Sequence, residues 1–168
     1  KVKYASDEDG VLLKVVSGDT DTGYKYEICF VPVAKTGDYI IPSNVVSIPA
    51  NAFAFSKLYK VIVPASVTYV GNGAFANSKI TEIVFEEALT RSVGSLDFGT
   101  KVFENSVNLE KVTLPACELT FNGEEDFDKG IFANCSNLNE INMAEGGNYK
   151  SLNGMLCTTV QNNLQVVF

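Results

Sequence analysis

The sequence predicts a repeat solenoid of the α/β type that is rich in β-strand, in which successive coils of the chain stack on one another. The main observation is that residues 42–63 and 64–85 are nearly alike, position for position. Phe53, for example, returns as Phe75. A fixed period of about 22 residues is typical of solenoids, because each repeat can bury its apolar side only against its neighbours.

Further copies follow at a longer period of about 29 residues, which is the second observation. Phe103 returns as Phe132, and Val112 returns as Ile141. We therefore expect about four units of roughly 22–29 residues within residues 42–147.

The longer units predict an insertion of about seven residues that occurs twice at one edge of the coil. Asp97 and Asp126 recur at the longer spacing and place the insertions at Gly94–Thr100 and Gly123–Lys129. Insertions on one face of a solenoid often carry function. This edge is therefore one candidate binding surface.

Residues 1–41 do not repeat, and we expect them to form an N-terminal β-hairpin cap. Val11–Val16 and Tyr24–Val33 are rich in β-branched and aromatic residues and flank the polar stretch Ser17–Gly23. This pattern is typical of two strands joined by a turn. Lys35–Asp38 predicts another turn before the repeats begin. A terminal repeat exposes its apolar side unless another segment covers it.

Residues 148–168 predict a capping hairpin or the beginning of a further repeat. Asn148–Cys157 and Leu164–Phe168 have the composition of strands, and Gln161–Asn163 has that of the turn between them. Together with residues 42–147, the two terminal segments are expected to make one structural domain.

Each unit contains one strand whose apolar residues alternate with outward residues. Val61 and Val63 would face the core, with Lys60 and Ile62 outward. Parallel stacking then aligns equivalent residues in columns. The charged column is Lys60, Glu82, Lys111 and Glu140. The column that grades from apolar to polar is Ile62, Val84, Thr113 and Asn142. Its apolar end predicts either a ligand contact or a patch covered by the N-terminal cap.

A small polar column follows the repeat phenylalanines. Asn77, Asn105 and Asn134 occupy equivalent positions, and Phe55 is the variant. Asparagine at a repeated turn usually bonds backbone groups there, so we expect a structural ladder and not a site. Cys135 follows Asn134 where the other units have serine, which favours a structural role over a nucleophilic one.

Composition excludes several function classes. The net charge is −7 and no Lys/Arg cluster occurs, which argues against a nucleic-acid partner. No apolar run approaches the roughly 20 residues of a membrane span. No charged and then apolar leader begins at Lys1, so we expect any export signal to be absent from these residues or already removed.

The residue types that are missing also bear on chemistry. The chain has no histidine, the commonest general base and a frequent metal ligand. It has no tryptophan, which disfavours an aromatic platform for sugars. Cys29, Cys117, Cys135 and Cys157 form no CxxC motif, so we expect buried thiols, with Cys117–Cys135 as the pair if any disulfide forms.

Acidic clusters occur in two predicted loops, Glu124–Asp128 and Asp19–Asp21. Clustered carboxylates can bind Ca²⁺, but neither has the spacing of an EF-hand, and solvated loops explain both. We expect no metal site, no cofactor and no catalytic residues.

The pattern P-x-S-V-x-x-V-x-x-x-A-F-x-x-S, carried by residues 64–78 and continued to Phe85, resembles the BspA-like leucine-rich repeats of bacterial surface proteins. Asn148–Leu156 resembles the element that ends such arrays, and residues 9–42 resemble their N-terminal hairpin. The resemblance implies a right-handed leucine-rich-repeat coil in an exported protein, on the bacterial cell surface or secreted, with the signal or anchor outside these residues. It implies adhesion or host-protein binding and supplies no catalytic residues.

The sequence therefore predicts a non-enzymatic binding module for a protein or glycan, such as a component of the host extracellular matrix. A structural spacer or assembly domain of a larger surface protein is the alternative, and a hydrolase is a third. Binding would use either the two outward columns or the insertion edge. The acidic residues assigned to that edge are Asp97, Glu124, Glu125, Asp126 and Asp128.

Overall fold

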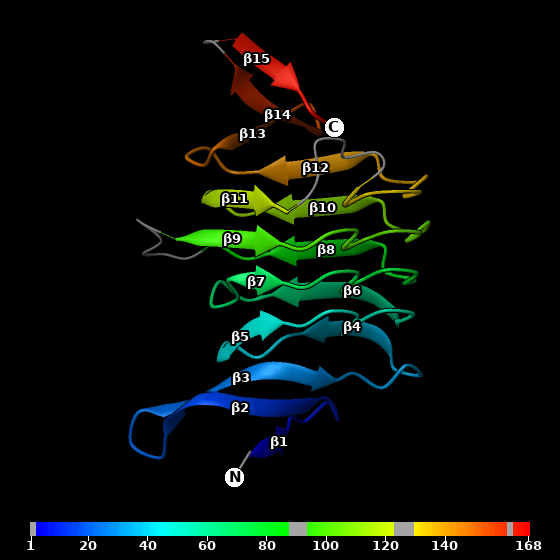
Figure 1. The fold of residues 1–168 in the computed structure, drawn as a ribbon. Coiled ribbons are helices and arrows are strands. Elements are labelled where there is room, and N and C mark those ends of the chain that lie inside the picture. Colours follow the sequence, from blue (N-terminus) through cyan, green and yellow to red (C-terminus); the bar gives the residue numbers. More distant parts are fainter. Residues whose placement is uncertain (1–2, 88–93, 123–129, 161–162) are drawn as a thin grey trace.

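The strands of the protein stack into a coil, with the N-terminal hairpin at one end and a small antiparallel sheet at the other (Figure 1). The structure, a computed structural model, describes residues 3–87, 94–122, 130–160 and 163–168. These residues form strands and turns but no helix, so the helical part of the expected α/β class is wrong. The segments that join the sheets contain residues with positive φ, such as Asn51 and Phe55, which interrupt a right-handed helix.

The larger sheet, sheet A, has seven strands in the order β1-β2-β3-β5-β7-β9-β11. From β3 onward its neighbouring strands are parallel. The strands are β1 (Tyr4–Ser6), β2 (Leu12–Asp19), β3 (Gly23–Phe30), β5 (Val45–Ile48), β7 (Tyr69–Val70), β9 (Ser95–Phe98) and β11 (Glu118–Phe121).

The second sheet, sheet B, has five parallel strands in the order β12-β10-β8-β6-β4. It contains the strands predicted from the alternating apolar residues, and Val61 and Val63 are fully buried as expected. The strands are β4 (Thr36–Ile40), β6 (Lys57–Val63), β8 (Glu82–Phe85), β10 (Lys111–Leu114) and β12 (Glu140–Met143).

The turns that lead from sheet A to sheet B also stack on one another. The backbone N–H of Phe53 donates to Ala74 O at 2.7 Å, and that of Phe75 donates to Val102 O at 2.8 Å. The rings of successive repeats consequently form a column through the core. Its members are Tyr39, Phe53, Phe75, Phe103, Phe132 and Phe168, with neighbouring ring centroids 4.9–6.1 Å apart.

The N-terminal segment forms an antiparallel hairpin of β2 and β3, and β3 pairs in parallel with β5. The turn between them is shorter than predicted, because the strands extend to Asp19 and begin again at Gly23. The predicted turn at Lys35–Asp38 is wrong in its larger part: Thr36–Ile40 is β4, the edge strand of sheet B, in register with β6.

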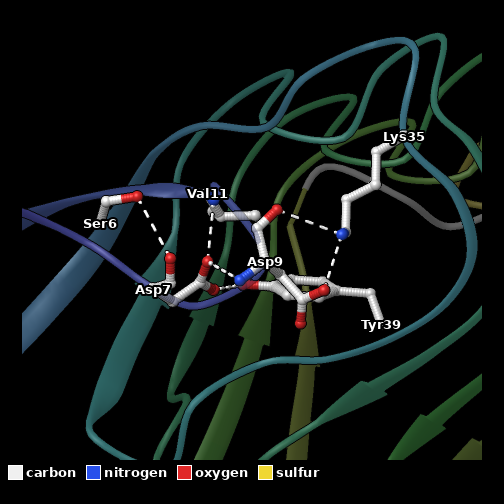
Figure 2. Close-up of polar contacts among 6 residues, drawn as sticks. All are labelled: Ser6, Asp7, Asp9, Val11, Lys35 and Tyr39. Atoms are coloured by element: carbon white, nitrogen blue, oxygen red, sulfur yellow. Dashed lines mark hydrogen bonds and ion pairs between the residues drawn. The ribbon is translucent and has the colours of Figure 1, made fainter.

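A network of polar contacts fastens the turn after β1 to β4 (Figure 2). The Asp7 carboxylate accepts hydrogen bonds from Val11 N at 2.8 Å and from Tyr39 Oη at 2.5 Å. Lys35 Nζ lies 2.7 Å from Asp9 Oδ1. Burial, and then the bond to Asp7, raises the pKa of Tyr39, so this phenol remains a donor at any ordinary pH.

At the other end, sheet C contains β13 (Tyr149–Leu152), β14 (Met155–Val160) and β15 (Asn163–Val166). One hairpin was predicted here, whereas β14 pairs antiparallel with both neighbours. The additional hairpin turns at Asn153 and Gly154, both of which have positive φ, the conformation that such tight turns require.

Asn148, Ser151 and Gly154 form hydrogen bonds with backbone groups of β11 and β12, the last strands of sheets A and B. Asn148 Oδ1 accepts from Leu119 N at 2.8 Å, and its Nδ2 donates to Leu119 O at 2.9 Å, as a neighbouring strand would. In sheet B, Ile141 N donates to Gly154 O at 2.7 Å and Ser151 Oγ donates to Ile141 O at 2.6 Å. These bonds occupy β11 and β12 at positions where a further strand would pair.

The predicted insertion at Gly94–Thr100 is wrong. These residues contain β9, and Phe98 is in register with Val70 on one side and Phe121 on the other. The extra residues instead separate β8 from β9 and, in the next coil, β11 from the following turn. Gly123–Lys129 lies outside the described residues.

None of the four cysteines is in a disulfide, and three of them are buried. Cys29 is exposed, contrary to prediction, because alternation along β3 turns Ile28 inward. Cys135 occupies the position of the buried Ser106, and its Sγ donates to Phe103 O at 3.1 Å. Burial raises the pKa of the Cys135 thiol to about 12, which makes it a structural and unreactive group.

Candidate functional site

The outward face of sheet B carries both predicted columns, in the predicted register. Lys111 is in register with Glu82 on one side and with Glu140 on the other, and Lys60 is in register with Glu82. Because equivalent strands of successive units pair in parallel, equivalent residues lie next to one another on the same face of the sheet. The predicted alignment of the columns is therefore confirmed, whereas a binding role for the face stays a prediction.

The charges of this face are paired. Lys60 Nζ lies 3.2 Å from Glu82 Oε2, and Lys111 Nζ lies 3.4 Å from Glu140 Oε1. The amide of Asn142 also donates to Glu140; this bond, and then the contact with Lys111, lowers the pKa of Glu140. Solvent screens exposed pairs of this kind, so they contribute little to stability. Their main effect is to remove net charge from the face.

The apolar column continues beyond the predicted residues. Ile40 of β4 is in register with Ile62 and is 65% exposed, so the N-terminal hairpin does not cover this end of the column. Thr113 is in register with Val84 and Asn142. Ile62 and Val84 are half-buried, so the strip that crosses the sheet is only partly exposed, and it changes from apolar at Ile40, Ile62 and Val84 to polar at Thr113 and Asn142.

A hollow of about 600 Å³ lies where β8, β10 and β12 end. It takes in Val84, Thr113 and Asn142 from the predicted column. Sequence reasoning missed the other lining residues, because half of them are the last, core-side residues of their strands and the other half follow the strands, so none belongs to an outward column. These are Phe85, Glu86, Glu87, Leu114, Met143 and Ala144. Glu87 is held in place, since its Oε1 accepts from Ala116 N at 2.5 Å.

The acidic residues assigned to the insertion edge do not join this site. Asp97 lies on β9 in sheet A, in register with Tyr69 and Thr120. Glu124, Glu125, Asp126 and Asp128 lie outside the described residues. The predicted edge is therefore not assembled in the part of the chain that the structure describes.

The described residues bring together no cluster of three or more acidic or cysteine side chains that could hold a metal ion. In the turn after β2, Asp19 Oδ1 instead accepts from Asp21 N at 3.0 Å and from Thr22 N at 2.8 Å. Hydrogen bonds to Thr22 and Asp21 lower the pKa of Asp19, which stabilises the carboxylate within its own turn. No helix suited to crossing a bilayer occurs within the described ranges.

Comparison with known proteins identifies the repeat. The model of the family described as "BspA type Leucine rich repeat region (6 copies)" matches residues 24–96 and 96–162. No curated protein matches the chain.

Three solved structures are similar to it. A leucine-rich cell surface protein from Faecalibacterium prausnitzii is 21% identical, with a TM-score of 0.49 over 84% of this chain and 39% of that protein. A leucine-rich repeat protein from Eubacterium ventriosum is 18% identical, with a TM-score of 0.46 over 92% of this chain and 47% of that protein. The pneumococcal vaccine antigen PcpA is 15% identical, with a TM-score of 0.45 over 93% and 54%.

The chain thus spans about half of these proteins or less. The family match extends over most of the chain, from the N-terminal hairpin to β14. The chain belongs to the BspA-type leucine-rich repeat family.

Proposed function

We propose that this chain is a non-enzymatic binding module of an exported bacterial surface protein, and that it recognises a protein or glycan partner through the outward face of sheet B. The observation that carries the proposal is the partly exposed strip from Ile40 to Asn142 with the hollow of about 600 Å³ at one end. Family membership supports a surface role. Extended faces of solenoids are also the surfaces that such proteins commonly use for partners.

The chemistry of the face indicates how a partner would be held. The paired lysines and glutamates of the charged column leave little net field along it, so recognition there would depend on shape and hydrogen bonds more than on long-range attraction, whereas Glu86 and Glu87 add negative charge at the hollow. Val84 and Met143 offer apolar contact, while Thr113 and Asn142 offer hydrogen bonds in the same hollow. The partner would be an apolar group with polar neighbours.

The insertion edge has less support as a binding surface, because Gly94–Thr100 contributes a strand of sheet A. The spacer remains the alternative function. It is favoured by the continuous column of stacked rings, which would make a stiff rod whether or not a partner binds.

Binding can be tested by blocking the hollow. Thr113→Arg places a long side chain there, and Thr120→Arg makes the same change on the exposed face of sheet A. Wild type is first screened against immobilised extracellular-matrix proteins and oligosaccharides. We expect the Thr113 variant to bind at least about tenfold more weakly, and the Thr120 variant to be unchanged.

A second variant tests the charged column directly. Glu82→Ala combined with Lys111→Ala disrupts both ion pairs of the face, whereas Lys14→Ala with Glu27→Ala disrupts an ion pair of sheet A. Undiminished binding by both the Thr113 variant and the Glu82/Lys111 variant, with the fold intact, would reject sheet B as the surface. A wild-type chain that binds no partner in the screen would favour the spacer.

A further inference from the structure

Phe55 occupies a backbone position that suits asparagine and not an aromatic residue. Its φ is +61°, in the left-handed region, and its side chain is 66% exposed. A bulky residue is a rare outlier in this conformation, whereas asparagine tolerates it. The equivalent residues of the next coils are Asn77, Asn105 and Asn134, all with positive φ. Since strained residues of this kind cluster at functional sites, Phe55 requires an explanation other than folding.

The asparagines form a ladder that Phe55 interrupts. Asn134 Nδ2 donates to Asn105 Oδ1 at 2.8 Å, and Asn105 Nδ2 donates to Asn77 Oδ1 at 3.3 Å. The backbone stack continues, because Phe55 N donates to Ala76 O at 3.0 Å. The ring, however, offers no oxygen to the next amide. The ladder therefore ends with the amide donor of Asn77 beside an exposed aromatic side chain.

These two residues line a hollow of about 360 Å³ that crosses three coils on the turn side of the molecule. The other lining residues are Asn51, Ala54, Asn72, Gly73, Ala76, Thr100, Lys101 and Glu104. Gly73 has positive φ, as Asn51 and Lys101 do at the equivalent positions of the neighbouring coils, and a Cβ on it would lie 2.8 Å from Asn51 Oδ1. Small residues thus leave space between the ring and the polar side chains.

The charge of this hollow is balanced. Lys101 Nζ lies 2.9 Å from Glu104 Oε1, so the charged groups that line it form an ion pair. The remaining polar groups are neutral. Asn72 Oδ1 accepts from Thr100 N at 2.9 Å, which fixes the orientation of that amide.

From these features we propose that the hollow at Phe55 is a binding site for a neutral carbohydrate. A sugar ring has an apolar C–H face that can pack on an aromatic ring and a rim of hydroxyls that bond to amides. The volume lies within the roughly 300–1,000 Å³ of small-ligand sites. The site is separate from the hollow of sheet B, so it adds a second ligand to the proposed function and does not depend on it. Phe55 takes the place that tryptophan, absent from the chain, often has in such sites.

The lack of tryptophan provides a direct assay. Phe55→Trp keeps an aromatic ring at the site and introduces a single indole into the chain. Its fluorescence is titrated with neutral oligosaccharides of glucose, galactose, mannose and N-acetylglucosamine. We expect a saturable change with at least one of them. Tyr59→Trp is the matched control, because Tyr59 is also an exposed aromatic residue but lies on β6, outside the hollow. Its fluorescence should not change on titration.

Affinity for the oligosaccharide found in this way is then compared among variants by calorimetry. We expect Phe55→Asn, which restores the residue of the other coils, to bind about tenfold more weakly or worse. Tyr59→Asn and Thr113→Arg should bind as wild type does. Absence of a response from every oligosaccharide, equal binding by Phe55→Asn, or equal loss in Tyr59→Asn would each overturn the proposal. Loss in Thr113→Arg alone would assign the sugar to sheet B and also overturn it.

Discussion

Replacement of Phe75 by alanine tests the column of stacked rings most directly. The side chain of Phe75 is fully buried, and its ring stacks on Phe53 at 4.9 Å and on Phe103 at 5.5 Å between centroids. Loss of the buried apolar surface costs about 2–3 kcal/mol, and the two ring contacts add about 0.5–1.5 kcal/mol each. These contributions add to about 3–6 kcal/mol, and buried Phe→Ala changes cost about 3–5 kcal/mol, so we expect the free energy of unfolding to fall by about 3–5 kcal/mol.

The measurement is urea unfolding followed by circular dichroism, because the chain has no tryptophan. Midpoint and slope are both recorded, since loss of cooperativity in a repeat protein would change the slope. Phe55→Asn is the control, because it also removes a phenylalanine, from a position in the preceding coil where the side chain is exposed and the backbone is strained. It should raise stability by about 1 kcal/mol through relief of strain. A loss below about 1 kcal/mol in the Phe75 variant would refute the stacked column as a source of stability.

Three further predictions concern the thiols and the strand edges. In native protein at pH 8 only Cys29 should react with an alkylating reagent, because the other three cysteines are buried. All four cysteines should react after the chain is unfolded without reductant. Two or fewer reactive cysteines in the unfolded chain would show that disulfides form. The Cys135 thiol has a pKa near 9.0 when exposed and about 12 in the fold, so its stabilisation is complete below about pH 9 and is lost as the pH rises toward 12. Cys135→Ser should therefore lose less stability than wild type between pH 8 and 10.5, and an equal loss in urea midpoint would contradict the assignment. Asn148→Leu removes the hydrogen-bond partners of Leu119 N and O at the edge of sheet A. This variant should be less stable by about 1–3 kcal/mol and should self-associate more readily, as measured by light scattering. A variant that stays monomeric with unchanged stability would show that Asn148 does not protect this edge.

The repeat made much of this fold predictable from sequence. Once Phe53 and Phe75 are recognised as equivalent, parallel stacking fixes the register of every strand between them. The column from Lys60 to Glu140 followed from the same equivalence and is confirmed in its geometry. The alternation along β3 also predicts an outward Cys29, against the general tendency of cysteine to be buried, and in the structure the alternation decides its position.

The insertions were misplaced for a different reason. The interruption after β11 lies both between Asp97 and Asp126 and between Phe103 and Phe132, so the two pairs have the same spacing although Asp126 is not the structural equivalent of Asp97. A spacing reports only a total length. In the structure Phe98 pairs with Phe121, whereas the spacing of the aspartates would pair it with Phe127. The strand after the repeat is therefore Glu118–Phe121.

The hollow of sheet B was not predictable from the columns. Glu86 and Met143 stand at or beyond the ends of their strands, where the period of two no longer assigns a face. Their positions depend on how each chain segment leaves the sheet. The site at Phe55 was visible in the sequence as a break in the asparagine column, but its meaning depended on the backbone conformation.

The direction of the hydrogen bonds has a mechanical consequence. The strands run across the stack and their bonds run along it, while the two ends of the chain lie toward opposite ends (Figure 1). A tension applied between those ends would load the bonds of successive coils in series, so that coils peel away one at a time. A coil of about 22 residues adds only about 4.8 Å to the folded stack, but about 70–80 Å when extended. Single-molecule pulling should therefore record steps of roughly this length, and one release of the whole stack would contradict a peeling order. On a surface exposed to flow, such a coil would lengthen under load before its attachment broke.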